Sequence, residues 1–153
     1  MENNEGLKVA YLALEETVAT SIIRQLVAAG DREFCESRAD AFYEEKSFEN
    51  ALLHYQAAIE LSQNDALLFN KRGMTHFYLK NNEKALLDYT QAIQLKKRPE
   101  FFNNRALVLH HLGRHEEALR DLMQAIELDP WNMGIVKNAI LLRLQEKVNV
   151  PYF

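Results

Sequence analysis

Apolar side chains recur along most of the chain at the spacing of α-helices. In residues 48–61, Ala51, Tyr55, Ala58 and Ile59 fall at positions i, i+4, i+7 and i+8, which places them on one face of a helix. A second stretch of similar length precedes this one, and the short polar turn Glu45-Lys46-Ser47 joins the two. The pattern predicts an all-α chain built from helical hairpins whose apolar faces meet.

The hairpin pattern occurs three times at nearly constant spacing. Its second helix carries the frame Ala-Leu, then Tyr or Leu, then Ala-Ile-x-Leu, which begins at Ala51, at Ala85 and at Ala118. The first helix of each hairpin is expected at residues 34–45, 67–79 and 101–112. Because one hairpin cannot bury its own apolar face, we expect the three to stack.

These residues resemble the tetratricopeptide repeat (TPR) family, whose repeat length matches the spacing of the frame. The family places an aromatic four positions before a small residue in the first helix, Ala-aromatic-Ala in the second, and Asp-Pro at the end. The matching positions are Phe69 and Gly73, Phe102 and Ala106, Ala51-Tyr55-Ala58, Ala85-Tyr89-Ala92 and Asp129-Pro130, with Cys35-Ala39 and Ala118-Leu122-Ala125 as weaker matches. The resemblance implies a right-handed α-solenoid of three stacked TPR units, at residues 32–65, 66–98 and 99–132.

Two helical segments flank the three units. Residues 133–148 are expected to form a helix that caps the last unit, with Ile135, Ala139 and Leu142 covering it and Arg143, Glu146 and Lys147 in water. The tail at residues 149–153 is apolar, and Tyr152 and Phe153 either fold back on the array or dock elsewhere.

The N-terminal segment, residues 1–31, contains an amphipathic helix at residues 7–29. Its stripe, listed in chain order, is Leu7, Tyr11, Leu14, Val18, Ile22 and Leu26, and further apolar residues lie beside it. Two interpretations are open. The segment forms a degenerate opening hairpin with a break near Glu15-Glu16-Thr17, or it forms a helix with a second apolar face for a partner.

Composition and charge narrow the class of protein. The 153 residues are 48% hydrophobic and carry a formal net charge of −4, which argues against general nucleic-acid binding. By segment, the net charges are −3 (1–31), −5 (32–65), +5 (66–98), −3 (99–132) and +2 (133–153), an alternation that either orients a charged partner or lets adjacent layers attract. With no apolar run of membrane length, no secretory signal and one cysteine, we expect a cytoplasmic protein.

The residues that could carry catalysis or bind a metal are better explained by packing and by turns. His111 and His115 are four apart, as helical zinc ligands can be, but the turn at Gly113 separates them. His76 falls at a position where the family packs an aromatic, and Cys35 is expected to be a small buried hydrophobe. The isolated glycines form no phosphate-binding loop. We therefore expect no enzyme activity, no cofactor and no metal.

The resemblance implies a concave groove lined by the first helix of each unit. The groove positions it assigns are Glu36, Asp40, Tyr43, Asn70, Lys71, Met74, Phe77, Asn103, Asn104, Leu107 and His110. The asparagines suit hydrogen bonds to an extended peptide, and Met74, Phe77 and Leu107 are expected to form an apolar floor. The family's carboxylate clamp for acidic chaperone tails needs basic residues where this chain has Glu36, Asp40 and Glu100, so such a tail is not expected as the ligand.

Two functions fit this fold. The first is a protein-protein interaction scaffold, an adaptor that binds a peptide or helix of a partner protein through the groove. The alternative is a structural subunit of a large cytoskeletal or ciliary (axonemal) assembly, held by its termini and outer edges. Neither interpretation involves nucleic acid or a membrane.

Overall fold

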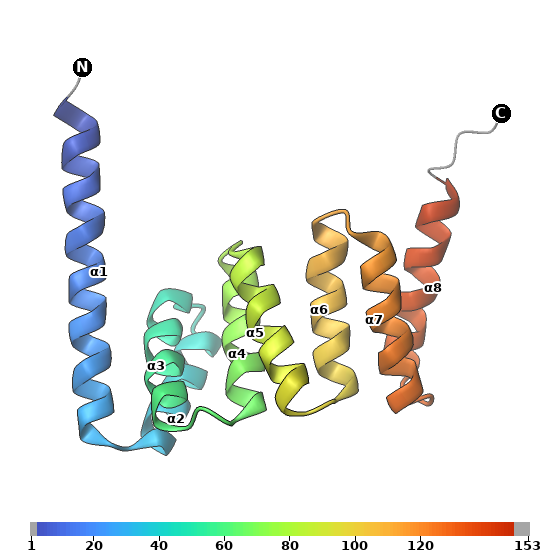
Figure 1. Ribbon diagram of the computed structural model, residues 1–153, viewed down its shortest axis with the longest axis horizontal. Helices are drawn as coiled ribbons and strands as arrows, with labels where there is room; N and C mark the ends of the chain where they lie inside the picture. The colour runs from blue at the N-terminus through green and yellow to red at the C-terminus, as the bar shows by residue number, and fades with distance from the viewer. Residues whose placement is uncertain (1–2, 149–153) are drawn as a thin grey trace. The chain divides into compact units, whose positions relative to one another are not determined.

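The computed structural model describes the backbone of residues 3–148 and the side chains of residues 13–145 (Figure 1). All regular secondary structure in that part of the chain is α-helical, which confirms the predicted fold class. The helices are α1 (Asn3–Ala29), α2 (Arg32–Glu44), α3 (Phe48–Leu61), α4 (Ala66–Tyr78), α5 (Asn82–Leu95), α6 (Pro99–His111), α7 (His115–Leu128) and α8 (Met133–Val148). None of these helices is long and apolar enough to cross a membrane.

The helices form two compact units, Met1–Gln63 and Asn64–Phe153. In the first unit, α2 and α3 form a hairpin, and α1 packs against α3. In the second unit, α4 and α5 form one hairpin, α6 and α7 form the next, α5 packs against α6, and α8 packs against α7. The second unit therefore contains two stacked hairpins and one further helix.

Small residues allow the helices of each hairpin to approach closely. Ala51, Ala58, Ala85 and Ala92 are fully buried, as the repeated frame predicts. The closest approach is at Gly73 of α4, where an added Cβ would lie 3.0 Å from the ring of the buried Tyr89. Burial of this alanine-rich seam, together with the aromatic rings around it, supplies most of the driving force for hairpin formation.

The turn inside each hairpin uses one residue in the left-handed region. These residues are Lys46 (φ 60°), Lys80 (φ 63°) and Gly113 (φ 73°), at equivalent places in the three repeats. At the other end of the hairpins, Asp31 and Asp65 cap α2 and α4: their carboxylates accept hydrogen bonds from the backbone N–H of Phe34 and Leu67.

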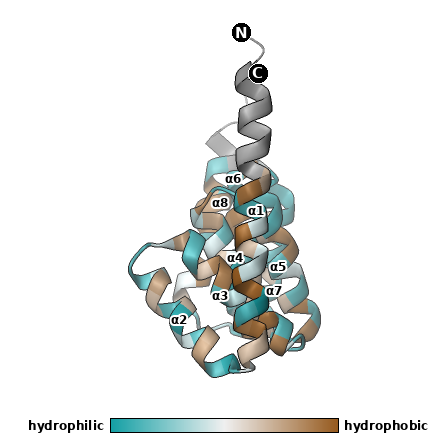
Figure 2. Ribbon diagram, turned by 90° about the vertical axis from the view of Figure 1, so that its left-hand side faces the viewer, coloured by the Kyte–Doolittle hydropathy of each residue, from teal (hydrophilic) through white to brown (hydrophobic). Residues whose placement is uncertain are grey.

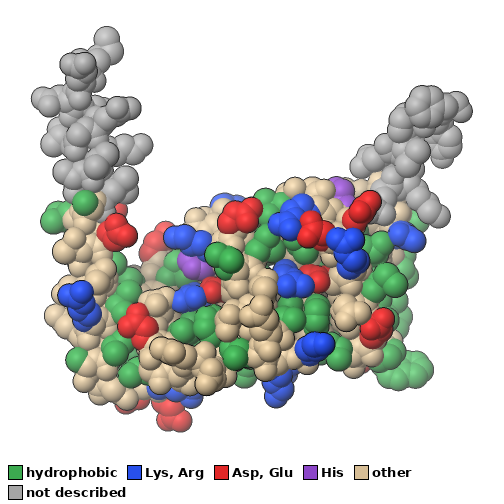
Figure 3. Space-filling model, in the orientation of Figure 1, with side chains coloured by type: hydrophobic (Ala, Val, Ile, Leu, Met, Phe, Trp, Pro, Cys, Tyr) green, Lys and Arg blue, Asp and Glu red, His purple; other side chains and the backbone are tan. Residues whose placement is uncertain are grey.

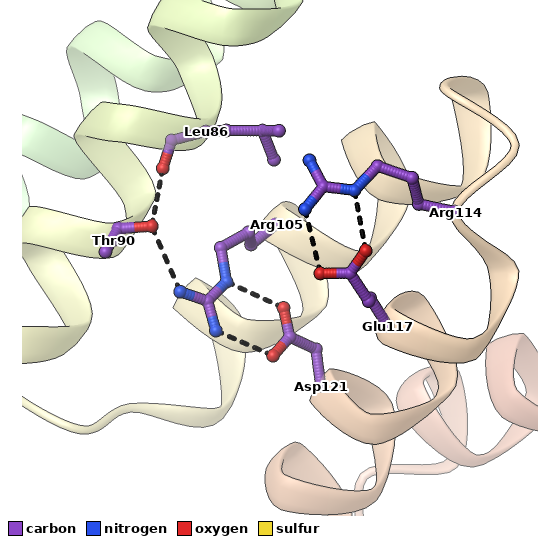
Figure 4. A network of polar contacts seen from close by, with 6 residues as sticks. All are labelled: Leu86, Thr90, Arg105, Arg114, Glu117 and Asp121. Carbon is purple, nitrogen blue, oxygen red and sulfur yellow. Dashed lines mark hydrogen bonds and ion pairs between the residues drawn. The ribbon is translucent and has the colours of Figure 1, made fainter.

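Buried ion pairs join the two helices of each hairpin in the second unit. Arg72 of α4 donates two hydrogen bonds to Asp88 of α5, at 2.8 and 2.6 Å. Arg105 of α6 does the same to Asp121 of α7, at 2.7 and 2.8 Å, and a third N–H of Arg105 donates to the hydroxyl of Thr90 on α5 (Figure 4). Arg105 therefore links two successive hairpins as well as the two helices of its own.

The flanking helices differ from the sequence prediction. The predicted break near residues 15–17 is wrong, because α1 is one unbroken helix in which the hydroxyls of Thr17 and Thr20 bond to the carbonyls of Ala13 and Glu16. The interpretation of residues 7–29 as a degenerate hairpin is therefore also wrong. These threonines are helix-compatible because each hydroxyl bonds to the carbonyl four positions before it.

The C-terminal helix covers the last hairpin as expected, with Ile135 and Leu142 buried and Arg143 exposed. Its outer surface, however, is more apolar than that of a solvating cap, because Ile140 and Leu144 are also exposed. The Tyr152-Phe153 tail and the side chains of Glu146 and Lys147 lie outside the described residues.

Candidate functional site

The predicted groove residues of the first unit bond to neighbours within that unit. Glu36 pairs with Arg32 on the preceding turn of α2 at 2.9 Å, and Asp40 accepts a 2.6 Å hydrogen bond from the hydroxyl of Tyr55 on α3. Burial, together with the acceptance of that hydrogen bond by Asp40, raises the pKa of Tyr55 far above its ordinary value. The Asp40 carboxylate thus supports the α2–α3 hairpin, and its role in binding a partner stays a prediction.

Asparagine amides connect the first helices of successive repeats in the second unit. Asn104 of α6 donates a 3.0 Å hydrogen bond to the side-chain oxygen of Asn70 on α4. Asn138 of α8 donates a 2.9 Å bond to the side-chain oxygen of Asn103 on α6. The three helices α4, α6 and α8 therefore share one face, on which amide groups lie in a row.

On the α4 part of this face, the side chains expected to form an open apolar floor are packed against their neighbours. Met74 and Phe77 pack against the core, and the ring of Phe77 also contacts that of His111, with centroids 5.2 Å apart. The amide nitrogen of Asn70 lies 3.7 Å from the sulfur of Met74. Lys71 is half-buried nearby. The predicted apolar floor is accordingly reduced to Leu107, which is exposed on α6.

A pocket of about 270 Å³ opens between α6 and α8 on the same face. Its lining residues are Asn103, Ala106, Leu107 and His110 from α6, Leu122 from α7, and Asn138, Leu141, Leu142 and Gln145 from α8. Leucine side chains form the floor, and amide groups and the His110 imidazole supply its polar atoms. The structure thus brings together three of the predicted site residues with residues of α8.

The α8 side of the pocket was not predicted, because residues 133–148 were interpreted only as a cap. A usable signal was present in the sequence: Asn70, Asn104 and Asn138 recur at the interval of the repeat. This spacing places the same residue type at the same position of α4, α6 and α8. The helix α8 therefore occupies the position of a first helix of a further repeat.

The pocket is uncharged near neutral pH. Its lining contains no Lys, Arg, Asp or Glu side chain. Burial, followed by the neighbouring His115 and His111, lowers the pKa of His110, so its ring is neutral at pH 7. The Nδ1 atoms of His110 and His115 lie 3.1 Å apart, which allows one neutral ring to donate to the other. The site can therefore bind by hydrogen bonding and apolar contact.

The residues with catalytic or metal-binding chemistry are placed as follows. No group of three His, Cys, Asp or Glu side chains within the described residues is arranged to hold a metal ion. Cys35 is buried in α2, and burial, with a smaller effect of Asp31, raises the pKa of its thiol. His111 ends α6, and His115 begins α7 beyond the turn at Gly113.

Solved structures with a similar fold are TPR domains and a bacterial chaperone. The TPR domain of Arabidopsis OM64 is 25% identical, with a TM-score of 0.71, over 74% of this chain and 95% of that chain. The second TPR domain of human RPAP3, solved in complex with the HSP70 peptide SGPTIEEVD, is 26% identical, with a TM-score of 0.68, over 74% and 98%. The Yersinia enterocolitica chaperone SycD, solved with a peptide of the translocator YopD, is 22% identical, with a TM-score of 0.70, over 74% and 93%.

Sequence models of the repeat family match three consecutive parts of the chain. Two models described as tetratricopeptide repeat match residues 66–99 and 99–132, and one described as TPR repeat matches residues 39–79. Together they cover residues 39–132, which include most of the three hairpins. The alanine seams, the left-handed turn residues and the stacked hairpins described above agree with this match. The chain belongs to the tetratricopeptide repeat family.

Proposed function

We propose that this protein is a non-catalytic interaction module that binds an extended, uncharged segment of a partner protein between α6 and α8. The observation that carries the proposal is the pocket itself, with a leucine floor beside a row of amide groups. A pocket of this size accommodates one or two apolar side chains. The amides around it match the donors and acceptors of a peptide backbone.

The asparagine bonds support an extended backbone as the ligand. The bond between Asn138 and Asn103 uses the nitrogen of one amide and the oxygen of the other. The second polar atom of each amide can then bond to a ligand, one as donor and one as acceptor. An extended peptide presents N–H and C=O groups in alternation, so it can satisfy both.

The relatives support peptide binding as the general mode. The RPAP3 domain, at 26% identity, was solved with an HSP70 peptide. That peptide, SGPTIEEVD, is acidic at three of its last four positions. In this chain the pocket lining has no basic side chain, and Glu100 is on the same helix, α6. We therefore expect an uncharged segment with an apolar anchor in place of an acidic tail.

The alternative of a cytoskeletal or ciliary subunit gains no support from the fold or from these relatives. The binding mode proposed here requires neither a large assembly nor a particular compartment.

The proposal is tested by selecting ligands from a displayed random peptide library with the full chain as bait. We expect enrichment of peptides that share one or two apolar positions and no acidic terminus. Synthetic versions of these peptides should bind more tightly than SGPTIEEVD. Replacing Leu141→Lys on the pocket floor should weaken the selected peptides at least tenfold, which corresponds to about 1.4 kcal/mol.

The matched control is Leu87→Lys, because Leu87 is also an exposed leucine but lies on α5, outside this pocket. Its affinity for the selected peptides should equal that of the unmodified chain. The proposal fails if the library yields no shared motif, if Leu141→Lys binds the peptides unchanged, or if SGPTIEEVD is the tightest ligand.

A further inference from the structure

The outer surface of α8 carries a stripe of apolar residues. Met133, Ile140 and Leu144 are between 54% and 70% exposed, and their spacing of seven and four positions places them on one face. The buried residues Ile135 and Leu142 lie on the opposite face, against α7. In Figure 3, hydrophobic side chains are exposed along the right-hand edge, over α7 and α8. We call Met133, Ile140 and Leu144 the α8 stripe.

Basic residues accompany the α8 stripe. Lys137 lies within the same face, one turn from Met133 and from Ile140, and Arg143 lies at its border. Residues 133–145 contain no Asp or Glu. An apolar surface that carries basic residues favours a partner with apolar and acidic residues side by side.

A second apolar stripe lies on α1, which projects beyond the hairpin it packs against. At 1.5 Å per residue, the 27 residues of α1 span about 40 Å, whereas the 14 residues of α3 span about 21 Å. The N-terminal half of α1 therefore extends past α2 and α3 (Figure 1). Seen from the α1 side, hydrophobic and hydrophilic residues alternate along the described part of this helix (Figure 2).

The exposed large apolar residues on the described part of α1 are Leu14, Val18 and Ile22, which we call the α1 stripe. They are between 37% and 64% exposed, whereas Ile23, on the side toward the hairpin, is half-buried. Glu15 lies beside this stripe, whereas Glu16 lies on the opposite side of the helix. The α1 stripe is thus apolar with one acidic neighbour, the complement of the α8 stripe.

We propose that the α1 stripe of one copy binds the α8 stripe of a second copy, so that the protein self-associates head to tail. The segment charges support this pairing, since residues 1–31 carry −3 and residues 133–153 carry +2. Pairing α1 with α1 would bring Glu15 of the two copies together, and pairing α8 with α8 would bring Lys137 and Arg143 together. Only the unlike pairing joins opposite charges.

The proposed contact is small and therefore concentration-dependent. The 16 residues of α8 are about 24 Å long, which limits the contact to roughly four helical turns. Such a helix pair lies at the low end of stable protein interfaces. Because the two surfaces are different, the contact can extend into open chains or close into rings.

The test is sedimentation velocity of the full chain from about 1 to several hundred micromolar. We expect a rise in average mass with concentration. Val18→Asp on α1 and Ile140→Asp on α8 should each be monomeric, because each replaces an apolar side chain in the contact with a charge that must be desolvated. A 1:1 mixture of the two variants should form dimers and nothing larger, since one intact α1 stripe meets one intact α8 stripe.

Leu87→Asp is the control for an added charge at an exposed apolar residue, since Leu87 is 71% exposed on α5. It should associate like the unmodified chain, and circular dichroism should show full helicity for all three variants. Glu15→Lys should weaken association at least tenfold, and mixing with Lys137→Glu should restore it.

Three results would overturn the proposal. A chain that stays monomeric at every concentration has no such contact. Association that survives Ile140→Asp points to pairing of α1 with α1, and association that survives Val18→Asp points to a surface that excludes α1. None of these variants alters the pocket between α6 and α8, so peptide binding and self-association can fail independently.

Discussion

At the scale of single residues, the three hairpin turns share one backbone conformation but place different side chains in it. Each turn needs a residue at positive φ, and the chain uses Lys46, Lys80 and Gly113 there. The left-handed region costs a residue with a Cβ about 1–2 kcal/mol, whereas glycine adopts it freely. An added Cβ at Gly113 would meet no atom within 4 Å. The cost of placing a side chain at this position therefore comes from the backbone conformation alone.

This contrast predicts opposite effects of two substitutions. Gly113→Ala should lower the free energy of unfolding by about 1 kcal/mol, because alanine takes on the left-handed strain. Lys80→Gly should raise it by less than about 1 kcal/mol, because glycine relieves the strain but loses more entropy on folding. Urea unfolding followed by circular dichroism measures both. Lys80→Ala, which keeps the strain, should give no gain; a gain equal to that of Lys80→Gly would show that the lysine side chain causes the strain.

At the scale of elements, the hairpins of the second unit are held by ion pairs as well as by apolar seams. The Arg105–Asp121 pair is largely buried, with exposed side-chain fractions of 23% and 8%. A second bidentate pair at the start of α7, Arg114–Glu117, has the same bond lengths of 2.7 and 2.8 Å but is exposed (Figure 4). Nearly identical geometry in two environments allows the effect of burial to be measured.

We expect Asp121→Ala to lower the free energy of unfolding by about 3 kcal/mol, because it leaves the Arg105 guanidinium buried without its carboxylate. Glu117→Ala should have little effect, since water solvates Arg114 when the pair is broken. Chemical unfolding of the full chain measures both changes. The double substitution Arg105→Met with Asp121→Leu should recover part of the loss, because no unpaired charge remains. Equal losses for Asp121→Ala and Glu117→Ala would contradict this account.

The sequence pattern predicted the helices well, because the same residue types recur at a nearly constant spacing and so fix the position of each helix. The second helices begin at Phe48, Asn82 and His115, where the repeated frame placed them. The ion pairs were not predicted, although Arg72 and Arg105 are one repeat apart, because apolar periodicity alone does not show which charged residues meet. Polar residues that recur at the repeat spacing are therefore as informative as the alanines.

The candidate site was predicted in part. Asn103, Leu107 and His110 do line one pocket, because positions i, i+4 and i+7 of α6 share one face. The contribution of α8 was missed, since a helix without a second helix after it was treated as a cap. Helical periodicity shows which residues share a face but not which face another element covers. This is also why the exposure of Ile140 and Leu144 could not be read from the sequence.

At the scale of the whole molecule, half-buried histidines make stability depend on pH in both compact units. In the first unit, burial and the nearby Arg38 lower the pKa of His54. In the second, burial lowers the pKa of His76 and of His110, and for His76 this outweighs the opposing attraction of Asp88. His54 stands at the repeat position where the later hairpins have Asp88 and Asp121, so the first unit has a neutral ring in place of a carboxylate.

These lowered pKa values predict that the protein loses stability as the pH falls from 7.5 to 5.5. The unfolded chain binds protons at these histidines near pH 6.5, whereas the folded chain resists protonation until lower pH, so acid favours unfolding. Thermal unfolding at fixed ionic strength should show a lower midpoint at pH 5.5 than at pH 7.5, in a range above the titration of most carboxylates.

His76→Phe and His76→Gln should both reduce this dependence, because neither side chain titrates. Phe should also be the more stable replacement at pH 7.5, since the Nδ1 atom of His76 is buried and bonds to no atom of the described residues. A midpoint that rises on acidification, or a dependence that both variants leave unchanged, would show that these rings do not control acid stability.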